Sequence, residues 1–250
     1  ARIMSLIATG SLVSLLAGLA TGLGALLVFI FPRVSDRFLD ASLGFAAGVM
    51  LAATSFSLLV PAIEIGGIWK TVVGISLGTV FLIYAERCIP HMHYITGSKG
   101  PPTQLSKIWL FVLAITIHNF PEGMAVGVGF GDGDMSAGTT LAIGISLQNM
   151  PEGLAVALAL LREKSTRWRA FLVALLTGLV EPVGGFLGIF AVSTAKFLLP
   201  YGLAFAGGAM LFVICEEIIP ETHSRGNDRE ATISLMIGFI IMMVLDTVFS

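Results

Sequence analysis

The sequence predicts an all-α integral membrane protein with eight transmembrane helices. Hydrophobic residues make up 56% of the 250 residues and charged residues only 12%, whereas a soluble domain is about 45–50% apolar and about 25% charged. The apolar runs are also long and continuous, unlike the ~10-residue alternating segments of a membrane β-barrel. A soluble globule and a disordered chain are excluded as well, because both need far more charge.

Eight segments are apolar enough to cross a bilayer, which needs about 20 mostly apolar residues. Short polar or glycine-rich connections separate them, and the longest, from His91 to Gln104, contains a flexible stretch at 97–102. We expect residues 1–250 to form a single transmembrane domain. The predicted spans are about 3–31, 38–62, 71–89, 108–130, 137–161, 170–193, 199–219 and 232–249.

The distribution of basic residues supports this count. With eight spans, 11 of the 14 Lys and Arg residues lie on one side of the membrane and only Arg2, Lys70 and Lys196 on the other. The positive-inside rule assigns the richer side to the cytosol, so both termini are predicted to be extracytoplasmic. The 11 residues are Arg33, Arg37, Arg87, Lys99, Lys107, Arg162, Lys164, Arg167, Arg169, Arg225 and Arg229.

Glycines recur at a spacing of four residues along several spans. This spacing indicates tight helix packing, and a smooth glycine face would also allow one bundle to slide on another. The sequence leaves both interpretations open. The pairs are Gly18/Gly22, Gly44/Gly48, Gly74/Gly78, Gly123/Gly127 and Gly184/Gly188.

Three carboxylates lie where a membrane protein rarely places charge. Glu122, Glu152 and Glu181 fall near the middles of the fourth, fifth and sixth predicted spans, which carry no Lys or Arg at that depth. A charge there costs at least about 2.5–3.5 kcal/mol. Bound cations are the simplest compensation, and bound protons or structural hydrogen bonds are the alternatives.

Two of these carboxylates belong to a duplicated motif. ITIHNFPEGMAV in the fourth span is followed 30 residues later by ISLQNMPEGLAV in the fifth. One span plus one loop separates the copies, so they run antiparallel at similar depth and form a pseudo-two-fold site at the midplane, an arrangement that secondary transporters use.

The spacing within the motif brings donor atoms together. Residues four apart share a helix face, so His118 projects with Glu122 and Gln148 with Glu152, while Asn119 and Asn149 serve an adjacent position. Prolines at 121, 151 and 182 remove backbone donors and bend or break the helices beside the three carboxylates.

These nitrogen and oxygen donors suit borderline divalent metals, with Zn²⁺ first and Cd²⁺, Fe²⁺ and Mn²⁺ as further candidates. Two divalent ions against three Glu would leave a net charge of about +1, so a two-metal site is electrostatically reasonable.

At the HNFPEG string beginning at His118 and its copy, the chain resembles the ZIP (Zrt- and Irt-like protein) family of metal transporters, and more narrowly its prokaryotic members. The resemblance includes the eight-helix topology, the Glu181 helix and the EIIPE string from Glu217, and covers effectively the full length. It implies two three-helix inverted repeats around helices 4 and 5, and a sub-bundle of helices 1, 4, 5 and 6 that moves against the rest.

The resemblance also implies a binuclear metal site in which Glu122 and Glu152 bridge the two positions. Many family members carry His where Gln148 stands, and His or Asp where Asn149 stands. The first position would be formed by Met50, His118, Glu122, Gln148 and Glu152, and the second by Asn119, Glu122, Asn149, Glu152 and Glu181.

Accessory sites are expected at both membrane faces. Glu216 and Glu217 end the seventh span on the cytosolic side. His91, His93 and His223 lie on the same side, either as solvated loop residues or as transient metal ligands at the exit. At the outer face, Glu64 and Asp246 are candidates for attracting cations or are simply interfacial.

The predicted function is secondary transport of a divalent transition metal, Zn²⁺ first, into the cytosol. No Walker motif or GxGxxG loop is present, so ATP would not drive it. The alternatives are a proton-coupled transporter of another solute, a metal exporter, and an intramembrane metalloprotease, which would need an HExxH motif that does not occur. No enzymatic activity or resident cofactor is expected.

The expected partners are divalent metal ions and the lipids of a bacterial inner (cell) membrane, which the chain crosses several times. A homodimer is left open. The net charge of −2 gives no reason to expect nucleic acid.

Overall fold

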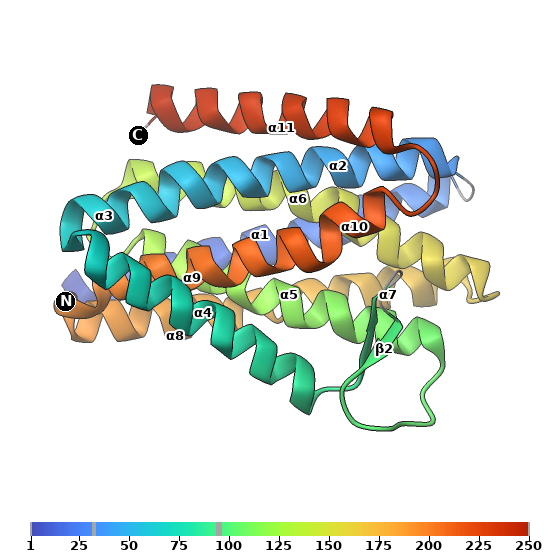
Figure 1. Ribbon diagram of the computed structural model, residues 1–250, viewed down its shortest axis with the longest axis horizontal. Helices are drawn as coiled ribbons and strands as arrows, with labels where there is room; N and C mark the ends of the chain where they lie inside the picture. Colours follow the sequence, from blue (N-terminus) through green and yellow to red (C-terminus); the bar gives the residue numbers. More distant parts are fainter. Residues whose placement is uncertain (1, 32–33, 94–96, 250) are drawn as a thin grey trace.

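The computed structural model describes residues 2–31, 34–93 and 97–249. Within these residues, eight helices are long and apolar enough to cross a membrane, and their ends differ from the predicted ones by no more than four residues. They run roughly along the long axis of the molecule, and the two ends of the chain lie at the same end of the bundle (Figure 1). This placement agrees with an even number of spans.

The first span is α1 (Arg2–Ile30). The second is α2 (Asp36–Ala52), continued by a π-helical segment η1 (Ala53–Leu59) and by α3 (Val60–Gly66). The third, fourth and fifth are α4 (Ile68–Cys88), α5 (Lys107–Gly129) and α6 (Met135–Arg162). The sixth span consists of α7 (Arg167–Gly178) and α8 (Glu181–Thr194). The seventh consists of the short 3₁₀ turn η2 (Lys196–Leu198), α9 (Leu199–Val213), a second π-helical segment η3 (Ile214–Ile218) and α10 (Ile219–Thr222). The eighth is α11 (Asp228–Phe249).

The fifth span lies at the centre of the bundle and the eighth at its edge. In the most apolar window of each, 72% of α6 is buried but only 11% of α11. The outer helices expose large apolar side chains, such as Trp69, Leu77 and Val80 on α4. Such a surface is stable in lipid, where apolar side chains need no cover and the helical backbone satisfies its own hydrogen bonds.

The packing of the spans follows an inverted two-fold pattern. The closely packed pairs are α1 with α6, α5 with α8, α2 with α11, and α4 with α9. Exchanging the first span with the sixth, the second with the seventh, the third with the eighth and the fourth with the fifth maps these pairs onto one another. The pattern agrees with the predicted three-helix repeats on either side of helices 4 and 5, and it places the duplicated motif on the two helices that exchange.

Glycines allow the backbones to touch at the motif. A Cβ on Gly123 of α5 would overlap the carbonyl oxygen of Glu181, and one on Gly153 of α6 would overlap that of Thr21 on α1. Most glycines of the spaced pairs lie equally close to a neighbouring helix: a Cβ on Gly18 or Gly184 would meet a backbone oxygen, whereas one on Gly22 would meet the side chain of Leu175. Close helix contact is therefore confirmed.

Prolines explain the two π-helical segments. Pro61 and Pro220 lack a donor N–H, and the residue before each reaches back five residues instead of four: Val60 to the carbonyl of Ser55, and Ile219 to that of Ile214. Wide turns of this kind are frequent at functional sites. By contrast, α5 and α6 continue through Pro121 and Pro151, and the predicted helix break beside Glu181 is present between α7 and α8.

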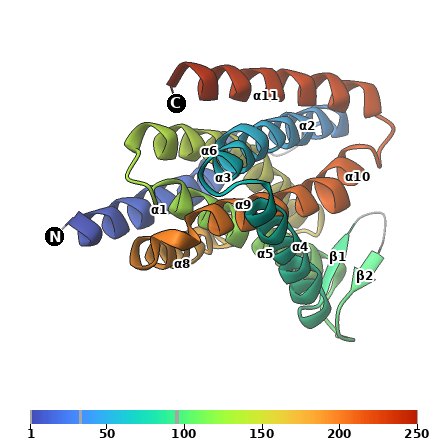
Figure 2. The same cartoon turned by 60° about the vertical axis from the view of Figure 1, so that its left-hand side comes forward.

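The connection after the third span is more ordered than predicted. Strands β1 (His91–His93) and β2 (Gly97–Lys99) form an antiparallel hairpin in which His91 pairs with Lys99. Part of the stretch expected to be flexible is thus a strand, because the backbone groups of two short segments satisfy each other. The hairpin lies near the end of α4 and the start of α5 (Figure 2).

Candidate metal centre

The duplicated motif places its polar side chains inside the bundle. The proposed ligands on α5, α6 and α8 are each no more than 3% exposed: His118, Asn119, Glu122, Gln148, Asn149, Glu152 and Glu181. Glu122 is within electrostatic range of both Glu152 and Glu181, and Glu152 is within range of His118. The three carboxylates predicted to gather at the midplane therefore do gather.

Most polar atoms of this cluster make no hydrogen bond of good geometry within the described part of the protein. They are both carboxylate oxygens of Glu122 and Glu152, both amide atoms of Asn119 and Gln148, Oδ1 of Asn149 and Oε2 of Glu181. Buried polar atoms in native proteins nearly always have a partner. The cluster therefore concentrates carboxylate and amide oxygens that would be available to a ligand.

The side chains are not yet arranged around an ion. Among the described residues, no group of three or more His, Cys, Asp and Glu side chains could hold a metal ion as the side chains stand. The Nε2 of His118 lies 2.5 Å from Oε1 of Glu217. Asn149 donates to Glu181 Oε1 at 2.7 Å and to the carbonyl of Ala17 at 2.8 Å. Ligation therefore requires side-chain rotation away from these partners.

Backbone contacts fix the position of Glu181. The hydroxyl of Ser14 on α1 donates to the Glu181 carbonyl at 2.9 Å, and Gly123 lets α5 approach the same carbonyl. Met50 is fully buried on α2, which packs against α6. The structure thus brings α1, α5, α6 and α8 together around the carboxylates, with α2 beside them.

A narrow cavity extends from His118 and Glu152 of this cluster toward the basic end of the bundle, which the sequence predicts to be cytosolic. Its volume is about 40 Å³, enough for a few water molecules, since one needs about 10–15 Å³. His118 and Glu152 line its inner part, and Glu217 and Glu221 line it further along the seventh span. The cavity therefore joins two members of the cluster to the acidic end of the seventh span.

The accessory residues have different environments. Glu217 lies on η3 and contacts His118, so the structure joins it to the predicted ligand cluster. Glu216 is 38% exposed and pairs with Lys99. Both ring nitrogens of His223 have protein partners, Ile219 and Thr222 for Nδ1 and Thr232 for Nε2.

The expectation that His91 is a solvated loop residue is wrong. Its side chain is fully buried, with Nδ1 2.8 Å from the Ile89 carbonyl and Nε2 3.9 Å from Oε2 of Glu86, because the hairpin folds it against the end of α4. The side chain of His93 lies outside the described residues. At the outer face, Glu64 is exposed on α3, whereas Asp246 accepts a hydrogen bond from Ser57 of η1.

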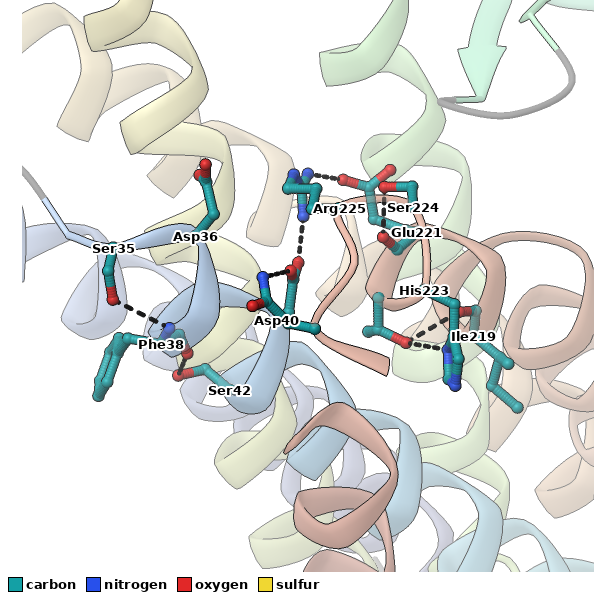
Figure 3. Close-up of polar contacts among 12 residues, drawn as sticks. Ser35, Asp36, Phe38, Asp40, Ser42, Ile219, Glu221, His223, Ser224 and Arg225 are labelled. Carbon is teal, nitrogen blue, oxygen red and sulfur yellow. Dashed lines mark hydrogen bonds and ion pairs between the residues drawn. The ribbon is translucent and has the colours of Figure 1, made fainter. Parts of the chain in front are cut away.

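Sequence reasoning missed a polar network at the basic end of the bundle. Asp40 is completely buried near the start of α2 and contacts Arg225, which also contacts Glu221 on α10 (Figure 3). An acidic residue inside the second predicted span was the available signal for Asp40. Its partner is 185 residues away, so no local pattern could have found it.

Comparisons with known proteins agree with this architecture. A family model described as ZIP Zinc transporter matches residues 91–246. Zinc transporter GufA of Myxococcus xanthus is 46% identical over 95% of this chain and 97% of its own length. Zinc transporter ZIPB of Bordetella bronchiseptica is 44% identical over 91% of this chain and 77% of its own, and human zinc transporter ZIP11 is 37% identical over 90% and 93%.

These matches extend over most of the chain and include the duplicated motif, the Glu181 helix and the acidic end of the seventh span. Eight apolar helices make the protein a multi-pass integral membrane protein, and its bacterial relatives indicate the inner membrane. The chain belongs to the ZIP zinc transporter family.

Proposed function

We propose that this chain carries Zn²⁺ across the membrane into the cytosol, without ATP, through a midplane site formed by helices 4, 5 and 6. The observation that carries the proposal is the cluster of buried carboxylate, amide and imidazole groups, most of whose polar atoms make no hydrogen bond of good geometry to the described protein. The names of the relatives, all zinc transporters, support the choice of metal.

Charge balance favours a cation as the missing partner. Glu122, Glu152 and Glu181 lie within electrostatic range of one another in the bundle interior, and the sequence from 108 to 161 contains no Lys or Arg. Uncompensated buried charge costs several kcal/mol per ion. Two divalent ions would offset three carboxylates, and a single ion would leave a net charge of about −1.

The proposed first position uses His118, Gln148 and the sulfur of Met50 together with Glu122 and Glu152. The second position uses the same two carboxylates as bridges, with ligands added from Asn119, Asn149 and Glu181. Imidazole and carboxylate are good zinc ligands, and the amide oxygens would make the second position weaker. Cd²⁺, Fe²⁺ and Mn²⁺ fit the same donor types and belong to the test.

The membrane potential is sufficient to drive influx. Moving a charge of +2 inward across 100 mV gains about 4.6 kcal/mol, at roughly 2.3 kcal/mol for each elementary charge. The cavity between His118 and Glu221 supplies the route on the cytosolic side. A metal exporter built on the same site would need an outward driving force, and this difference can be measured.

The proposal is tested by zinc uptake into proteoliposomes at a defined potential. Glu122→Gln combined with Glu152→Gln is expected to abolish uptake, whereas Glu163→Gln, an exposed carboxylate that follows α6, is expected to leave it unchanged. Zinc flux in the double variant equal to that of the wild type would overturn the midplane site.

Two further measurements separate the alternatives. A proton-coupled transporter of another solute would keep its activity in His118→Ala, whereas zinc uptake should fall sharply. An exporter works against the membrane potential, so its zinc transport would need a second gradient, such as protons, and would not follow the imposed potential. The protein could carry out this function as a monomer or as a homodimer, and the mass of the detergent-solubilised protein distinguishes the two states.

A further inference from the structure

The seventh span ends in three acidic side chains with three different partners. Glu217 contacts His118 of the midplane cluster, Glu216 contacts Lys99, and Glu221 contacts Arg225. Glu217 and Glu221 line the same cavity. A cation that leaves the midplane for the cytosol therefore passes Glu217 first and approaches Glu221 next.

Arg225 is held at this place by a second acid. One guanidinium nitrogen contacts Asp40, which is completely buried on α2, and another contacts Glu221 (Figure 3). Asn227 adds a hydrogen bond to the other oxygen of Asp40 at 2.8 Å. The Arg225 side chain is only 12% exposed. The rigid fork of a guanidinium suits a bridge between two carboxylates, so the cation is fixed between them.

Lys99 repeats this arrangement at Glu216. Its ammonium group contacts Glu216 and lies 3.6 Å from Oε2 of Glu86, whose side chain is only 8% exposed at the end of α4. Each basic residue is thus anchored by one buried acid from the second or third span and covers one acid at the end of the seventh.

Both basic residues keep their charge at neutral pH. Burial alone would lower the pKa of Arg225, but the adjacent Glu221 and Asp40 outweigh it and raise that pKa. Burial also opposes the charged form of Lys99, and its hydrogen bond to Glu216 together with the charge of Glu86 raises the pKa of Lys99. Each basic residue therefore places a positive charge beside one of the two acids, Lys99 beside Glu216 and Arg225 beside Glu221.

A transport pathway needs sites that bind an ion strongly enough to accept it and weakly enough to release it. Without Arg225, Glu221 and Asp40 would be a pair of carboxylates with a charge of −2 beside the exit, a strong trap for a divalent cation with oxygen ligands. We propose that Arg225 and Lys99 are positioning residues for release of the ion. Arg225 pairs with Glu221 and Lys99 with Glu216, so that Glu217 is the acid that receives the outgoing ion. The two pairs thereby prevent retention of the ion at the cytosolic mouth. This inference rests on the proposed inward zinc transport.

The test compares zinc uptake kinetics in proteoliposomes with zinc binding in detergent. For Arg225→Gln, we expect a maximal rate about tenfold lower, a KM for external zinc within twofold of wild type, and one additional zinc ion retained by the purified protein. Arg229→Gln, an exposed Arg on α11, serves as the control and should match the wild type in all three measurements.

Rescue separates this role from a structural one. Adding Glu221→Gln to Arg225→Gln removes the uncovered carboxylate, so the maximal rate should recover at least threefold and the additional zinc should be lost. A wild-type rate in Arg225→Gln overturns the proposal. So does a low rate that persists in the folded double variant, because it shows that Arg225 only supports the fold.

Lys99→Gln provides the second arm if Arg225→Gln does not yield folded protein. Lys99 is 28% exposed, so solvent screens its charge and the expected decrease in maximal rate is smaller, about threefold. Adding Glu216→Gln to Lys99→Gln should restore the maximal rate. A wild-type rate in Lys99→Gln then overturns the proposal. Failure of the midplane site would appear elsewhere, as undiminished flux in the Glu122 and Glu152 double variant.

Discussion

Replacing Gly123 with Ala is expected to damage both stability and transport. A Cβ at this position of α5 would overlap the carbonyl oxygen of Glu181, an atom of the helix backbone that cannot rotate away. The two helices would have to separate at the point where Glu122 and Glu181 approach each other. Glu181 would then move out of reach of the proposed second metal position.

The expected change in the free energy of unfolding is the difference between two opposing contributions. Overpacking costs about 1–3 kcal/mol, and a backbone-to-backbone clash belongs at the upper end of this range. Alanine recovers about 1 kcal/mol relative to glycine through its helix propensity. The net destabilisation is about 2 kcal/mol, which corresponds to a decrease in Tm of roughly 4–8 °C for a chain of this size.

Gly10→Ala on α1 is the matched control. Its Cβ would lie 3.2 Å from Cβ and Cγ1 of Ile189, a tight contact that a shift of a few tenths of an ångström relieves, without the backbone overlap found at Gly123. The assay is thermal unfolding in detergent, followed by zinc uptake of both variants in proteoliposomes. Equal Tm values for the two variants, with wild-type uptake in Gly123→Ala, would refute the claim that this contact positions Glu181.

Three other variants test separate contacts. Asn149→Asp should lower the Tm of the metal-free protein, because a carboxylate replaces the amide donor to Ala17 and Glu181, and should enlarge the zinc-induced increase in Tm; an unchanged zinc effect would contradict ligation there. Ser14→Ala removes the hydrogen bond to the Glu181 carbonyl and should cost about 0.5–1.5 kcal/mol, measured as a lower Tm. Asp132→Cys, with Cys88 and Cys215 changed to Ser, should react with an impermeant thiol reagent from outside the cell; labelling only from the cytosol would invalidate the topology.

The sequence was sufficient for the spans and for the midplane cluster. Membrane helices leave a strong signal, because each must be long, apolar and internally hydrogen-bonded. The carboxylates at 122, 152 and 181 were identifiable because charge is so costly at that depth. Their gathering followed from the antiparallel repeat, which the packing of α5 and α6 with their neighbours matches.

Features that depend on distant partners were not predictable in the same way. The pairing of Asp40 with Arg225 joins two residues that no periodicity connects. The burial of His91 depends on a hairpin whose two strands are only three residues long. The π-helical segments formed before Pro61 and Pro220, whereas sequence reasoning looked for distortion at Pro121 and Pro151. A proline shows that one backbone donor is missing, but the surrounding packing decides how the helix adapts.

Anomalous scattering from crystals grown with Cd²⁺ or Zn²⁺ tests the central claim most directly, because it locates the ion without reference to activity. The account predicts a strong peak between α5 and α6, bridged by Glu122 and Glu152, with His118 turned away from Glu217 toward the ion. Ordered metal found only at surface carboxylates or at the cytosolic histidines, with the midplane side chains unchanged, would contradict it.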